Sequence, residues 1–143
     1  MRRYLFVLAA LLAPAAVAAP ETKMLLRQNW AIQSSADVTE SGAALSVAGF
    51  RPPRGWHPAT LPTTVFSALV AARIYPDPYF GTNLRSVPGV KYPIGFNFSN
   101  APMPDDGPFR KPWWFRTEFK LPAEYRGKTL WPNFDGINFR ANV

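Results

Sequence analysis

The segment KPWWFRTEF, residues 111–119, decides the fold class that the sequence predicts. Taken as a strand, it directs Trp113, Phe115 and Phe119 to one side, because side chains alternate along a strand. Trp114 and Arg116 then point to the opposite side. The first face is typical of a protein core. The second face suits either a sugar-stacking platform or a second packed layer.

The rest of the chain predicts a mainly β fold with one short helix and a long ordered loop. The expected strands cover residues 30–38, 43–50, 112–121, 129–134 and 137–143, and TESG joins the first two as a hairpin. A helix is expected from Val65 to Tyr75, capped by Thr63 or Thr64 and stopped by Pro76. The loop at 76–112 is rich in aromatic residues, so we expect it to be ordered and packed on a neighbour.

The N-terminus predicts export. Arg2 and Arg3 precede a long apolar run, and Ala16-Val17-Ala18 has the small-x-small pattern that signal peptidase recognises. The run is shorter than the roughly 20 residues that span a bilayer. Residues 1–18 are therefore predicted to be a signal peptide, residues 19–143 a secreted or periplasmic domain, and no membrane contact is expected after cleavage.

Charge and cysteine content disfavour several classes of function. The chain has 16 Lys and Arg against 9 Asp and Glu, a net charge of +7, which falls to +5 without the two signal-peptide arginines. These basic residues are scattered, which argues against a nucleic-acid partner. Cysteine is absent and His57 is the only histidine, so we expect no disulfide, no metal site and no cofactor.

Four segments together resemble a known family. They are WAIQSSADV, GFRPPRGWHPATLPTTVFSALVAARIYPDPYFGTNLRSVP, KPWWFRTEF and NFDGINFRANV. Their order and spacing resemble the N-terminal sugar-binding domain of glycoside hydrolase family 2, in the exo-β-D-glucosaminidase branch close to β-mannosidases. The resemblance implies a galactose-binding-like β-sandwich of jelly-roll type. It also implies that the domain is incomplete at its C-terminus, since family members continue with more strands, an immunoglobulin-like domain and a catalytic TIM barrel.

No catalytic residue is predicted in this chain. Retaining glycosidases use two carboxyl groups about 5–5.5 Å apart, and the family supplies both from the barrel. Nothing here matches those motifs. Asp105 and Asp106 are adjacent acids on a proline-flanked loop, where neighbouring side chains diverge. The chain is therefore expected to be inactive alone.

The candidate substrate-binding residues are Asp77, Tyr79 and Asn83 in DPYFGTN, together with Trp114. Asp77 and Asn83 offer hydrogen-bonding groups suited to sugar hydroxyls, and Tyr79 offers a flat apolar face. The alternative is that this loop docks on the catalytic barrel. Trp114 is interpreted as either an interdomain contact or a sugar platform, whereas Trp113 is expected in the core.

These observations predict the non-catalytic N-terminal part of a secreted glycoside hydrolase that acts on β-linked glucosaminides or mannosides. Its expected partners are a β-linked amino-sugar oligosaccharide and the downstream domains of the same protein. Two alternatives remain open, namely a free-standing carbohydrate-binding module and a degenerate fragment without activity.

Overall fold

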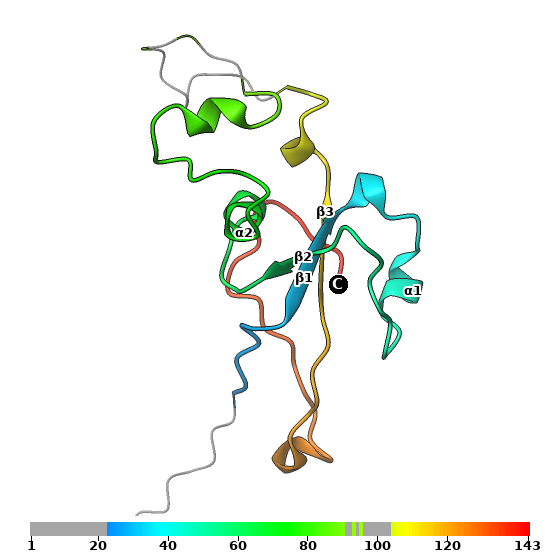
Figure 1. Ribbon diagram of the computed structural model, residues 1–143. Coiled ribbons are helices and arrows are strands. Elements are labelled where there is room, and N and C mark those ends of the chain that lie inside the picture. The colour runs from blue at the N-terminus through cyan, green and yellow to red at the C-terminus, as the bar shows by residue number, and fades with distance from the viewer. Residues whose placement is uncertain (1–22, 91–92, 94, 96–103) are drawn as a thin grey trace, which may run out of the picture.

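A three-stranded antiparallel sheet forms the centre of the protein. The computed structural model describes residues 23–90, 93, 95 and 104–143, so the predicted signal peptide lies outside the described residues (Figure 1). Strand β1 (Trp30–Ser34) lies between β2 (His57–Ala59) and β3 (Trp113–Thr117). The mainly β fold class is confirmed at this level, and the jelly-roll sandwich stays a prediction.

The segment at 111–119 pairs with the central strand. Ile32 of β1 lies opposite Phe115 of β3, and Gln33 lies opposite Trp114. Directly opposed residues of an antiparallel pair share a face of the sheet. The predicted alternation is therefore confirmed, with Phe115 on the face of Ile32 and Trp114 on the face of Gln33.

Helix α2 (Val65–Ala71) covers the first face of the sheet and completes a small core. The buried cluster consists of Ile32, Ala59, Ala68 and Leu69. Trp30 and Trp113 are half-buried and pack against this cluster, which confirms the expected core position of Trp113. Phe115 and Phe119 are exposed, so the apolar face of the segment is covered only at its N-terminal end.

Helix α2 begins where the sequence predicts and ends earlier. The Thr64 hydroxyl accepts a hydrogen bond from the backbone N–H of Ser67 at 3.1 Å, which confirms the predicted cap. Arg73 adopts a φ of 61°, and the N–H groups of Arg73 and Ile74 donate to Val70 and Leu69. This Schellman arrangement ends the helix. The predicted continuation to Tyr75 is therefore wrong.

The predicted strand at 43–50 is also wrong, because its first residues form the one-turn helix α1 (Gly42–Leu45). The Ser41 hydroxyl accepts a hydrogen bond from the backbone N–H of Ala44 at 3.3 Å, so the TESG segment caps a helix instead of turning a hairpin. Helices α1 and α2 lie on opposite sides of the sheet (Figure 1). No helix of the described residues has the length and apolarity needed to cross a bilayer.

The middle of the predicted long loop, residues 91–92, 94 and 96–103, lies outside the described residues, so the order of the whole loop stays a prediction. Short 3₁₀ turns occur at Asn83–Ser86 and Pro108–Arg110. The Phe109 ring meets Phe66 of α2 edge to face at 5.8 Å, and the Phe66 ring stacks with Tyr75 at 5.9 Å. These contacts pack Tyr75, just before the loop, and Phe109, near its end, against α2.

The predicted strands at 129–134 and 137–143 are wrong, because both segments are irregular and exposed. A strand needs a hydrogen-bonded neighbour, and no strand of the described residues pairs with these segments. Pro132 lacks a backbone donor, and the Asn133 amide bonds locally to Asp135 at 2.8 Å. Large apolar side chains consequently face solvent here, with Trp131 85% and Phe139 98% exposed.

Replacing Leu69 with alanine tests whether the α2 face holds the fold together. Leu69 is only 2% exposed. Leu69→Ala is expected to lower the free energy of unfolding by about 2–5 kcal/mol, because it removes transfer energy and leaves a cavity. Urea unfolding followed by tryptophan fluorescence measures this change. The matched control, Leu121→Ala at an exposed site, is expected to cost about 1 kcal/mol or less, and equal losses for the two variants would contradict this assignment of the core.

Candidate functional site

The turn at Asp77–Asn83 brings three of the four predicted site residues together. The Asp77 carboxylate accepts a hydrogen bond from the backbone N–H of Tyr79 at 2.9 Å. The Asn83 side-chain amide donates to the Asp77 carbonyl, also at 2.9 Å. Both polar side chains therefore use hydrogen-bonding capacity to hold the turn.

The same turn presents two aromatic rings to the outside. Tyr79 is 96% exposed and Phe80 is 75% exposed. Flat aromatic faces of this kind can contact a sugar ring or another protein surface. The arrangement makes Tyr79 the presented group and Asp77 and Asn83 the groups that position it.

Trp114 lies apart from this turn, on the other face of the sheet. Its indole is half-buried, and a Cβ added at Gly42 would lie 3.3 Å from its Cη2 atom. The indole therefore packs under α1, where the absence of a side chain at Gly42 permits the close approach. The structure does not bring Trp114 together with Tyr79.

Arg116 organises the layer that covers this second face. Its Nε donates to the Leu45 carbonyl at 2.9 Å, and its Nη2 donates to the Val47 carbonyl at 3.2 Å. The guanidinium also lies over the Phe50 ring, 5.4 Å from its centroid. The sequence left two roles open for this face, a sugar-stacking platform and a second packed layer. The Arg116 contacts build the second packed layer.

Glu118 completes the same network. Its carboxylate accepts a hydrogen bond from Arg116 Nη2 at 3.0 Å. Its two oxygens also accept from the backbone N–H of Gly49, at 3.0 and 3.1 Å. The Arg116 hydrogen bond, and then the Gly49 hydrogen bond, lower the pKa of Glu118 from its ordinary value of 4.5. The carboxylate thus stays ionised and holds the segment after α1 against β3.

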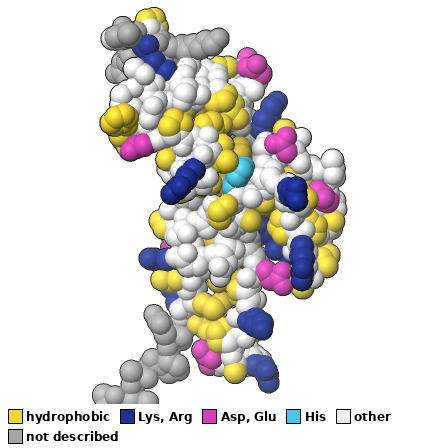
Figure 2. All heavy atoms as spheres, viewed as in Figure 1, with side chains coloured by type: hydrophobic (Ala, Val, Ile, Leu, Met, Phe, Trp, Pro, Cys, Tyr) yellow, Lys and Arg dark blue, Asp and Glu magenta, His cyan; other side chains and the backbone are white. Residues whose placement is uncertain are grey.

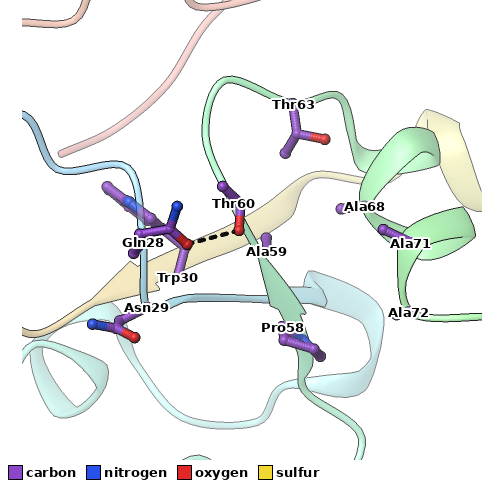
Figure 3. A pocket seen from close by; sticks show the side chains of 10 residues that line it. All are labelled: Gln28, Asn29, Trp30, Pro58, Ala59, Thr60, Thr63, Ala68, Ala71 and Ala72. Atoms are coloured by element: carbon purple, nitrogen blue, oxygen red, sulfur yellow. Dashed lines mark hydrogen bonds between the residues drawn. The ribbon is translucent and has the colours of Figure 1, made fainter.

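A hollow of about 390 Å³ lies at the end of the sheet where β1, β2 and α2 meet (Figure 3). Its polar lining comes from the approach to β1 and from the chain after β2, and consists of Gln28, Asn29, Thr60 and Thr63. Its apolar lining consists of Trp30, Pro58, Ala59 and three alanines of α2 and its C-cap, Ala68, Ala71 and Ala72. Figure 3 shows the amide side chains on one side and the alanines on the other.

Hydrogen bonds between separate segments of the chain fix the polar rim of the hollow. The Thr60 hydroxyl donates to Oε1 of Gln28 at 3.1 Å. Asn29 adopts a φ of 63°, which asparagine tolerates, and its carbonyl accepts from the Thr117 hydroxyl at 3.2 Å. The indole N–H of Trp30 donates to the Leu26 carbonyl at 2.8 Å. Sequence reasoning missed this site, because nothing in the sequence links Gln28 to Thr60 before the pairing of β1 with β2 is known.

The other residues considered for chemistry are dispersed. Asp105 forms an exposed ion pair with Arg110 at 3.5 Å. His57 lies in β2 opposite Ile32, and Figure 2 shows the histidine at the surface. Across the described residues, no group of three or more acidic or histidine side chains has the geometry of a metal site. Figure 2 also shows lysine and arginine side chains spread over the visible face among acidic ones.

Comparison with known proteins relates the chain to glycosidases. It is 33% identical over 114 residues to an exo-beta-D-glucosaminidase of Streptomyces avermitilis and 30% identical over 114 residues to one of Amycolatopsis orientalis. Each alignment covers 80% of this chain, which spans about a tenth of the length of these curated relatives. No family model and no solved structure matches the chain. The similarities support a fragment of the exo-beta-D-glucosaminidase family without fixing which domain it is.

Titration of Glu118 tests the network on the second face. Because the folded-state pKa is depressed, this carboxylate contributes to stability above pH 4.5, and the contribution is lost as the pH falls through the folded-state value. NMR of the side-chain carboxyl carbon is expected to show a midpoint below 4.5. Arg116→Ala removes the largest cause of the shift, so the midpoint is expected to rise.

If Arg116→Ala leaves the Glu118 midpoint unchanged, Arg116 does not hold the carboxylate and the layer has another cause.

Proposed function

We propose that this chain is the N-terminal, non-catalytic part of a secreted family 2 glycoside hydrolase that acts on β-linked glucosaminides. In this proposal the β-sheet belongs to a galactose-binding-like jelly roll, and residues 1–18 direct export. The observation that carries the proposal is the similarity over 114 residues to two exo-beta-D-glucosaminidases. Both relatives are about ten times longer than the matched segment, which supports a role within a larger protein.

Exposed apolar surface supports this role. Many large apolar side chains face solvent and are therefore available for contact with another protein surface. The most exposed of them are Tyr79, Phe80, Trp131, Phe139 and Val143. We infer that other domains of the same protein cover part of this surface.

The turn at Asp77–Asn83 is the proposed contact with carbohydrate or with the catalytic domain. Hydrogen bonds from Asp77 and Asn83 hold the turn, and Tyr79 is presented with almost its whole ring accessible. Trp114 is half-buried beneath α1 and is the less accessible aromatic group. In this proposal Tyr79 meets the β-linked amino-sugar chain or the barrel, and Trp114 supports the sheet.

The surroundings of two carboxylates, Glu118 and Asp105, favour a non-catalytic role for these groups. A glycosidase general acid needs a pKa raised toward neutrality. Arg116 and the Gly49 N–H instead lower the pKa of Glu118, and Asp105 pairs with Arg110 at the surface. We therefore assign the hydrolytic step to another part of the larger protein.

A segment exchange tests the proposal. In the Amycolatopsis orientalis exo-beta-D-glucosaminidase, the 114 aligned residues are replaced by the matching residues of this chain. The chimera is expected to be soluble and to release p-nitrophenol from p-nitrophenyl β-D-glucosaminide. The chain alone is expected to release none, because uncatalysed glycoside hydrolysis is far too slow to detect.

The matched control carries the aligned segment of the Streptomyces avermitilis enzyme in the same place. If that control is active and the chimera with this chain is insoluble or inactive, the proposed role is wrong. Turnover by the purified chain alone would contradict its assignment as non-catalytic.

A further inference from the structure

We propose that the hollow between β1, β2 and α2 binds one neutral pyranose ring, at a site separate from the Tyr79 turn. The proposal takes only its ligand class, carbohydrate, from the proposed function. Everything else comes from the lining of the hollow, which combines amide and hydroxyl groups on one side with apolar groups on the other. A pyranose also combines a polar and an apolar surface, since its hydroxyls lie at the ring edge and its C–H groups form apolar faces.

The polar side offers hydrogen-bonding groups that the fold has not used. Gln28 accepts a hydrogen bond from Thr60 through Oε1, which leaves both N–H groups of its amide without an acceptor among the described residues. The side-chain amide of Asn29 also has no partner among them. Gln28, oriented by the Thr60 hydrogen bond, is the amide that faces the hollow and can donate to sugar hydroxyls, whereas the Asn29 amide points away from Thr60 (Figure 3).

The apolar side suits a ring of limited size. Trp30 packs against the buried core, and its indole N–H is held by Leu26, so the indole is fixed in place. Ala68, Ala71 and Ala72 form a wall without long side chains opposite the amides (Figure 3). The volume of about 390 Å³ is near the lower end of the range of about 300–1,000 Å³ for small-molecule pockets. One sugar ring therefore fits this site better than a long oligosaccharide.

The lining also favours an uncharged ligand. No aspartate, glutamate, lysine or arginine is among the described residues that line the hollow. A protonated amine placed here would give up water without gaining a carboxylate partner, which is unfavourable. We infer that the site prefers a sugar with a 2-hydroxyl over the same sugar with a 2-ammonium group, although the two curated relatives are named for glucosaminides.

A matched pair of ligands tests the proposal on the full chain. Methyl β-D-glucopyranoside and methyl β-D-glucosaminide differ only at position 2, and saturation-transfer NMR compares them at a pH where the amine is protonated. The glucopyranoside is expected to receive saturation from the protein and to bind more tightly. Gln28→Ala is expected to weaken its binding by about tenfold, because it removes a neutral hydrogen-bonding group.

Ala71→Leu is the decisive variant, because the larger side chain fills the hollow. Ala71 is exposed and leucine is a good helix former, so the change is expected to leave α2 folded. It is expected to abolish binding, whereas Ala43→Leu, the same change on α1, is expected to leave binding unchanged. The inference is overturned if neither ligand binds, if Ala71→Leu binds as the parent does, or if the glucosaminide binds more tightly. Activity of the segment-exchange chimera is independent of these results, so failure of the pocket and failure of the proposed function are distinguishable.

Discussion

The pairing of β1 with β3 is the interaction on which the rest of the structure depends. Ile32 and Phe115 lie opposite each other although 83 positions separate them in the chain, so this pairing closes most of the molecule into one loop. Closing such a loop costs entropy that grows only slowly with length. The burial of Ile32 with Leu69 on one face and the Arg116 contacts on the other offset this cost. Both layers lose their support if the two strands separate.

The two faces of this sheet serve different purposes. On the α2 face, apolar burial sets the position of the helix, and the helix in turn supplies the alanine wall of the hollow. On the α1 face, the guanidinium of Arg116 ties irregular backbone to β3 by directed hydrogen bonds. The proposed recognition groups lie at the margins of this frame, in the Gln28 amide beside β1 and in Tyr79 beyond α2. This separation is consistent with the proposed role, in which the chain positions a ligand or a neighbouring domain and another part of the protein cleaves the glycosidic bond.

Sequence patterns predicted the structure correctly where that structure depends on neighbouring residues alone. Alternation predicted the two faces of 111–119, and Thr64 predicted the start of α2. The helix end was missed because Arg73, which is not a glycine, takes the left-handed conformation that closes the helix. Residues 43–50 and 129–143 alternate like strands, yet strand formation depends on a partner that local sequence does not reveal. The hollow was missed for the same reason, since its two polar edges meet only through the pairing of β1 with β2.

Amide hydrogen exchange of the full chain tests most directly whether this pairing organises the protein. The account predicts that the hydrogen-bonded amides of residues 30–34 and 113–117 are the most protected, because opening them requires loss of both layers. Amides of residues 129–143 are predicted to exchange fast, since no strand among the described residues pairs with them. Protection of 129–143 equal to that of β1 would contradict the account and show that the C-terminal segment forms strands of a larger sheet.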